Sequence, residues 1–117
     1  MAAQVQIVLD AHDPKRLAAF WAEVLGYVAD PLPGDPEEWS ALVDPDGNGP
    51  RLLLQKVVER KGVKNRVHLD IGVGKDAMKA RAHELSKLGG TYVREHDEHL
   101  GHWIVMMDPE GNEFCLH

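Results

Sequence analysis

Three histidines at spacings of three residues form the densest group of potentially reactive side chains in the sequence. His96, His99 and His102 would gather their imidazoles if this stretch were helical, and could then bind a metal ion. Gly101 interrupts the stretch and a β-strand is expected to follow, which argues against regular helical geometry. We therefore expect a solvated loop here, with His102 at the start of a strand as a candidate pocket residue.

The chain has one cysteine, Cys115, which excludes an intrachain disulfide and any paired-cysteine zinc or redox motif. Thirteen Lys and Arg against nineteen Asp and Glu give a formal charge of -6, which disfavours nucleic acids and anionic membranes as partners. No apolar run resembles a membrane span or a secretory signal. The sequence thus predicts a cytoplasmic protein, and 117 residues predict one domain, 1–117.

A repeated ten-residue pattern divides the chain into two modules. Residues 39–48 and 103–112 share Trp-x4-Asp-Pro-acid-Gly-Asn at an offset of 64 residues. The proline presets φ, and the glycine and asparagine tolerate positive φ, as a hairpin turn requires. This duplication predicts modules at about 1–60 and 64–117.

Each module is predicted to fold as β-α-β-β-β. The first helix has Asp13 as N-cap, Pro14 at its first position and Gly26 as C-cap. The second is expected from about Lys75 to Leu88, ended by two glycines. The expected strands are 5–9, 27–29, 39–43 and 51–58 in module one, and 67–71, 91–94, 102–107 and 113–116 in module two.

A module of about 55 residues with one helix cannot cover both faces of a four-stranded sheet, so the modules are expected to share a core. We predict an α+β fold in which the two modules form one curved mixed sheet with the helices outside. Equivalent positions of both modules would then meet on the concave face, which is the expected ligand site.

These features resemble the vicinal-oxygen-chelate superfamily, which contains glyoxalase, bleomycin-resistance proteins and extradiol dioxygenases. The resemblance covers essentially the whole chain and is closest to short glyoxalase-like domain proteins. Phe20-Trp21, the segment 65–70 and the segment 108–115 carry it. It implies the fold described above, but an activity does not follow from a fold.

Enzymes of this superfamily hold a divalent metal with His, Gln and Glu side chains from the first and last strands of each module. The resemblance places Gln6 and His68 at the first-strand positions, and Gln55 and Cys115 at the last-strand positions. None of the four is a carboxylate, so a cation would gain little in return for its lost hydration. We therefore favour no metal or other cofactor; a divalent metal on these four residues is the alternative.

The expected ligand pocket comprises Gln6, Trp39, Gln55, His68, His102, Trp103 and Cys115. The two tryptophans enter equivalent strands, and either pack a helix on the sheet or line the cavity, where they would stack on a flat ligand. The resemblance implies a protein that binds a small organic molecule, as a lyase, isomerase or dioxygenase-type enzyme. The alternatives are a non-catalytic drug-sequestering protein of the bleomycin-resistance type, which the negative charge favours, and a scaffolding domain without a ligand.

We also predict a homodimer. The resemblance implies one, and an open sheet leaves strand edges with unpaired backbone groups that association would cover. The strand at 5–9 lacks the Lys or Pro that would protect an exposed edge, so it is predicted to lie at the interface.

Overall fold

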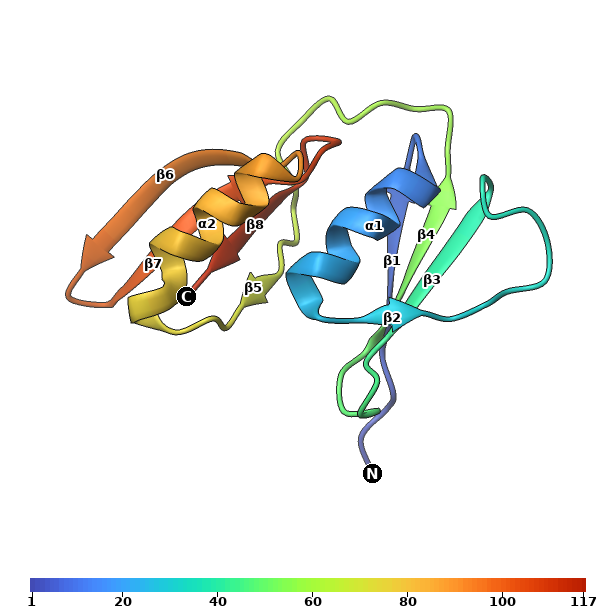
Figure 1. The fold of residues 1–117 in the computed structure, drawn as a ribbon, viewed down its shortest axis with the longest axis horizontal. Coiled ribbons are helices and arrows are strands. Elements are labelled where there is room, and N and C mark those ends of the chain that lie inside the picture. The colour runs from blue at the N-terminus through green and yellow to red at the C-terminus, as the bar shows by residue number, and fades with distance from the viewer. The chain divides into compact units, whose positions relative to one another are not determined.

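The computed structural model describes residues 1–117, which form two compact units, Met1–Arg60 (unit one) and Lys61–His117 (unit two) (Figure 1). Unit one contains β1 (Gln6–Ala11), α1 (Pro14–Leu25), β2 (Val28–Ala29), β3 (Trp39–Val43) and β4 (Arg51–Lys56). Unit two contains β5 (Asp70–Ile71), a 3-10 turn (Lys75–Ala77), α2 (Met78–Lys87), β6 (Thr91–Glu98), β7 (Gly101–Met107) and β8 (Glu113–Leu116).

Each unit contains a four-stranded mixed sheet. The strand order is β1-β4-β3-β2 in unit one and β5-β8-β7-β6 in unit two. In both sheets the first strand of the unit runs parallel to the last, and the other neighbours are antiparallel. The predicted α+β fold of tandem β-α-β-β-β modules is confirmed. A core shared by both modules, and a single domain over 1–117, stay predictions.

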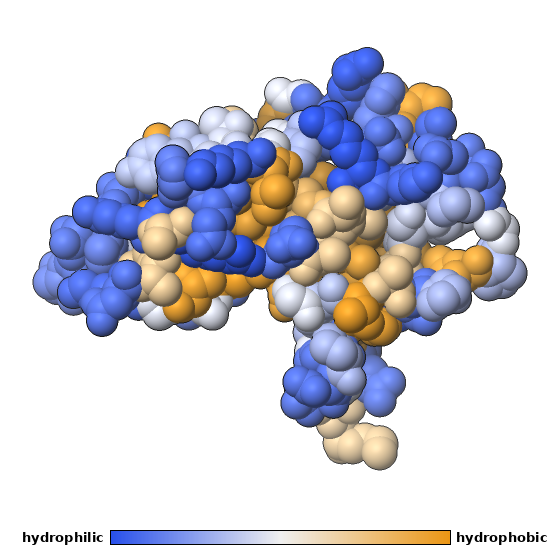
Figure 2. All heavy atoms as spheres, in the orientation of Figure 1, coloured by the Kyte–Doolittle hydropathy of each residue, from blue (hydrophilic) through white to orange (hydrophobic).

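Each helix buries one apolar stripe against its own sheet. In unit one, Leu17 and Trp21 of α1 are buried with Leu52 and Leu54 of β4. In unit two the buried side chains are Met78, Ala82 and Leu85 of α2 with Ile104, Met106, Phe114 and Leu116 of the sheet. Figure 2 shows hydrophilic side chains over much of the outer surface of α2. Neither helix is long and apolar enough to cross a membrane.

The two helices begin differently. The Asp13 carboxylate accepts a hydrogen bond from the Arg16 N–H at 3.2 Å, Pro14 follows it, and Gly26 ends α1 with φ 68°, as predicted. The predicted start of the second helix at Lys75 is instead a 3-10 turn, and α2 itself begins at Met78. Ala77 precedes α2 and has no side-chain acceptor, so the helix lacks the capping bond that fixes the start of α1.

The repeated turn is built around its first aspartate. Asp108 is buried, and its carboxylate accepts hydrogen bonds from the Glu110 N–H (2.9 Å), the Asn112 N–H (3.0 Å) and the Asn112 side-chain amide (2.8 Å). Asp44 accepts from three backbone N–H groups, those of Asp46, Asn48 and Gly49. As predicted, these turns join β3 to β4 and β7 to β8.

The strands of unit two differ most from their predicted lengths. The strand expected at 67–71 is reduced to Asp70–Ile71, and β6 runs on to Glu98. The prediction of a solvated loop over 96–102 is wrong, because this stretch forms the β6–β7 hairpin, with Asp97 opposite His102. Two cross-strand contacts stabilise the hairpin: His96 stacks on Trp103, and His102 pairs with Glu95.

Candidate functional site

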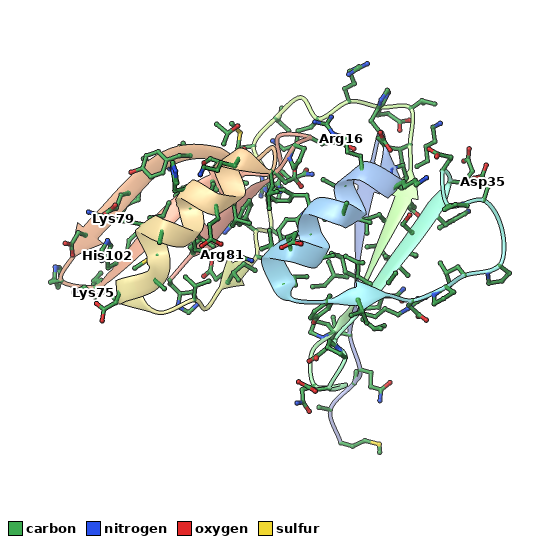
Figure 3. The ribbon with its side chains drawn as sticks, in the orientation of Figure 1. Arg16, Asp35, Lys75, Lys79, Arg81 and His102 are labelled. Atoms are coloured by element: carbon green, nitrogen blue, oxygen red, sulfur yellow. The ribbon has the colours of Figure 1, made fainter.

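Unit two carries a cavity of about 590 Å³ where β5 and β8 meet the start of β7. This volume lies within the range of about 300–1,000 Å³ that small-molecule sites occupy. Four of the seven predicted pocket residues line it: His68, His102, Trp103 and Cys115. The other lining residues are Asp70, Lys75, Met78, Leu100, Gly101 and His117. Figure 3 shows Lys75 and His102 at the same end of unit two.

Three of these lining residues form a compact cluster. The donor atoms of His68, Asp70 and Cys115 all lie within 4.8 Å of one another. The parallel pairing of β5 with β8 sets Asp70 beside Cys115, and the Cys115 N–H donates to the Leu69 carbonyl at 2.9 Å. His68 precedes Asp70 by two residues, the spacing that puts two side chains on one face of an extended chain.

Asp70 was not among the predicted site residues. Its spacing of two residues from His68 was the signal that could have placed both side chains on one face. Asp70 therefore brings to the cluster a carboxylate that the four predicted ligands lack.

The Cys115 thiol is held in its protonated form. Burial is the largest cause that raises its pKa, followed by the negative charge of Asp70 and by the hydrogen bond that the thiol donates to that carboxylate. The positive charges of Lys64 and Arg94 oppose this rise without reversing it. At neutral pH the cluster therefore contains a thiol and not a free thiolate.

His102 is oriented from the opposite strand. Its Nε2 lies 2.8 Å from Oε2 of Glu95, and the Lys79 Nζ lies 3.9 Å from the same oxygen. Its Nδ1 is buried and has no hydrogen-bond partner. Trp103 is also held in place, because its indole stacks on His96 with ring centroids 4.8 Å apart and an interplanar angle of 20°. Two side chains of the cavity wall are thus fixed before any ligand arrives.

The predicted residues of unit one have different surroundings. The Gln6 side-chain oxygen accepts a hydrogen bond from Arg51 at 2.7 Å, and the Gln55 amide donates to Asp10 at 2.7 Å. Gln6 lines an open hollow of about 840 Å³ with the N-terminal segment. Trp39 lines another cavity, of about 380 Å³, whose wall includes Ala18 and Ala22 of α1. The two tryptophans of the repeat therefore have unlike surroundings within their units.

The strand register corrects the equivalence expected between the modules. β1 pairs Gln6 with Arg51, and β5 pairs Asp70 with Cys115, so both pairs are related by the repeat offset of 64 (70 − 6 and 115 − 51). The counterpart of Cys115 on β4 is thus Arg51, and Gln55 lies four residues further along, opposite Asp10.

This register decides how well each unit suits a divalent metal. In unit one the Arg51 guanidinium donates hydrogen bonds to the Gln6 side-chain oxygen and, at 2.9 Å, to Asp30. The Gln6 oxygen that would bind a metal is therefore already bonded to a positively charged group. The unit-one residues therefore do not fit a metal ion. The unit-two cluster of imidazole, carboxylate and thiol does.

Comparison with known proteins identifies the family. The family model described as a glyoxalase-like domain matches residues 6–117. Among curated proteins, none matches the chain. Similar solved structures include the fosfomycin resistance protein FosX from Mesorhizobium loti (14% identity, 100% of this chain and 91% of that chain, TM-score 0.76). Another is a glyoxalase/bleomycin resistance/dioxygenase family enzyme from Burkholderia phytofirmans PsJN (18% identity, 97% of each chain, TM-score 0.78).

A third similar structure is a mutant of the fosfomycin resistance protein FosX from Listeria monocytogenes, complexed with Mn(II) and 1S,2S-dihydroxypropylphosphonic acid (13% identity, 100% of this chain and 90% of that chain, TM-score 0.79). At such low identities these structures share a fold with the chain, and their ligands remain their own. The family model, by contrast, covers nearly the whole sequence. The chain belongs to the glyoxalase-like domain family, within the vicinal-oxygen-chelate superfamily.

Proposed function

We propose that this protein binds a small organic molecule with a flat ring in the cavity of unit two. The observation that carries the proposal is that His68, His102, Trp103 and Cys115 all line one cavity of about 590 Å³. A hollow of this size that combines apolar walls with a few polar groups is typical of ligand sites.

The cavity wall indicates what kind of molecule would fit. Trp103 offers an aromatic surface for stacking, and Met78 and Leu100 add apolar contacts. Lys75 and Asp70 contribute one charge of each sign at the same wall, so polar substituents of the ligand would fix its orientation. We therefore infer a planar, largely apolar ligand that carries at least one hydrogen-bonding group.

The state of Cys115 favours binding over covalent catalysis. A cysteine nucleophile needs its thiolate, and the thiol here has a raised pKa and donates a hydrogen bond to Asp70. The proposed activity is accordingly binding of the ligand without a covalent step at Cys115.

A panel of planar aromatic compounds with neutral, cationic and anionic substituents tests this function. The protein is treated with a chelator, and binding is followed by thermal shift and by saturation-transfer NMR. We expect several compounds that compete for one site, and a loss of affinity of about tenfold in Trp103→Leu, because the stacking surface is removed.

Trp39→Leu is the matched control, since Trp39 holds the equivalent place in the repeat but lines a different cavity. Its affinity should equal that of the wild type. If no compound binds, or if both variants lose affinity equally, the proposed site is wrong.

A further inference from the structure

We propose that His68, Asp70 and Cys115 form a site for a thiophilic divalent cation of the zinc class, held within unit two alone. This site goes beyond the binding of an organic ligand and does not depend on it. It also departs from the arrangement that the superfamily implies, in which both modules supply ligands.

The geometry of the cluster suits such a cation. Metal–ligand lengths of about 2.0–2.3 Å put the donor atoms around a tetrahedral zinc ion roughly 3.5 Å apart. The three donor atoms here lie within 4.8 Å of one another. Cys115 is buried on β8, whereas the His68 and Asp70 side chains are exposed and free to adjust. Small rotations of these two side chains therefore bring all three atoms to coordination distance of one ion.

The chemistry of the donors selects the cation. One imidazole nitrogen, one carboxylate oxygen and one thiolate sulfur are all established zinc ligands, and three protein ligands leave a fourth position open. A thiolate disfavours hard cations such as Mg²⁺ and Mn²⁺, and the general affinity order also places Mn²⁺ well below Co²⁺ and Zn²⁺. The cluster should thus prefer zinc to the Mn(II) found with the FosX protein from Listeria monocytogenes.

The metal would take the place of a proton. In its absence the Cys115 thiol keeps its proton and donates a hydrogen bond to the Asp70 carboxylate. When the metal–sulfur bond forms, this proton leaves for solvent, so one thiol and one divalent cation yield one metal thiolate and one released proton. No oxidant or reductant takes part in this exchange.

Titration with Co²⁺ tests the site directly, because cobalt reports its ligands by absorption. The full-length chain without a histidine tag is stripped of metal and titrated with no organic ligand present. We expect saturation at one equivalent, with a thiolate-to-cobalt charge-transfer band. Zn²⁺ should abolish the band stoichiometrically, and a hundredfold excess of Mn²⁺ should leave it unchanged.

Variants assign the ligands. Cys115→Ser should lose the charge-transfer band, and His68→Ala and Asp70→Asn should each weaken cobalt binding by about tenfold or more. The matched controls are His83→Ala and Asp76→Asn, exposed residues of unit two outside the cluster, which should bind cobalt like the wild type. Circular dichroism checks the fold of each variant. If Cys115→Ser does not fold, the exposed positions His68 and Asp70 decide the outcome.

The proposal is overturned if cobalt gives no charge-transfer band, if the band survives in Cys115→Ser, or if Mn²⁺ displaces cobalt readily. It is also overturned if the controls weaken binding as much as the cluster variants do. Because metal binding is measured without organic ligand, and ligand binding is measured with a chelator present, either proposal can fail while the other stands.

Discussion

The contact between Cys115 and Asp70 has the largest effect on the chemistry that unit two can support. It follows from the register of two short strands, because β5 sets Asp70 directly beside Cys115 of β8. A carboxylate beside a buried thiol keeps the thiol protonated and, at the same time, supplies a charge that a cation can use. The same pair therefore makes a poor nucleophile and a suitable metal site.

Replacing Asp70 by Asn should lower the pKa of the Cys115 thiol. The substitution removes the negative charge and weakens the acceptor of the thiol proton, two of the causes that raise this pKa. Ultraviolet absorbance of the thiolate measures the pKa, and the signal is specific because the chain has one cysteine. Asp76→Asn, which is outside the cluster, should leave the titration unchanged. An unaltered thiol titration in Asp70→Asn would contradict the contact.

Asp44 should make the stability of unit one depend on pH. The backbone N–H of Asp46, followed by that of Gly49, lowers the pKa of Asp44 below its ordinary value of 3.8. The stabilisation is complete above pH 3.8 and is lost as the pH falls through the lowered folded-state pKa. Urea unfolding from about pH 2 to pH 7 should therefore show a difference between wild type and Asp44→Asn that vanishes in acid. A difference that persists at the lowest pH would refute this.

The sequence could predict only part of the site, for reasons specific to each residue. His102, Trp103 and Cys115 have fixed spacings from the repeated turn, so the repeat indicates their strands. Lys75 and Leu100 lie in a 3-10 turn and a hairpin tip, and only folding brings them to the cavity. Gln55 was misplaced because the sequence does not display the pairing of β1 with β4, which sets Arg51 at the place that Cys115 holds on β8.

At the scale of elements, the sequence predicts best those elements whose ends are set by residues close together in the chain. Asp13, Pro14 and Gly26 define α1 in the sequence and in the structure alike. The strands of unit two depend on pairing between distant residues, which the sequence does not display. β6 extends to Glu98 because β7 lies opposite it, and β5 keeps only the two residues that pair with β8.

The C-cap of α1 tests whether the left-handed backbone conformation of Gly26 requires a glycine. Gly26 has φ 68°, and a Cβ added there would meet no atom within 4 Å, so Gly26→Ala should be disfavoured by the backbone alone. We expect the free energy of unfolding to fall by about 1–2 kcal/mol. Urea denaturation measures the change.

Gly62→Ala is the matched control, because Gly62 also has open space around it but no positive φ. Its free energy of unfolding should stay the same or rise slightly, since alanine restricts the unfolded chain. Equal destabilisation by both substitutions would show that the loss does not come from the left-handed conformation of Gly26.

At the scale of the whole molecule, the duplication is visible in the strand order of both units. The same offset of 64 residues relates the repeated turns and the pairs Gln6–Arg51 and Asp70–Cys115. The residues at these equivalent positions have diverged, however. Unit one carries an amide held by a guanidinium, and unit two carries a carboxylate beside a thiol. The duplicated fold thus supports different chemistry in its two halves.

The homodimer stays a prediction of this account. β1 is an edge strand of the sheet of unit one, and an edge strand carries backbone groups that association can cover. Sedimentation at micromolar concentration should give a species of twice 13.0 kDa. Val8→Lys, which puts a charge on this exposed edge strand, should shift the equilibrium toward monomer. A wild-type monomer at all concentrations would contradict the prediction.

The central claim is that unit two holds the ligand site, and amide chemical-shift mapping by NMR tests it most directly. The tightest-binding compound of the aromatic panel is titrated into the isotope-labelled, metal-free protein. The account predicts shift changes concentrated at residues 68–70, 100–103 and 115–117, which surround the cavity of about 590 Å³. Changes confined to Met1–Arg60, or spread without preference over both units, would contradict it.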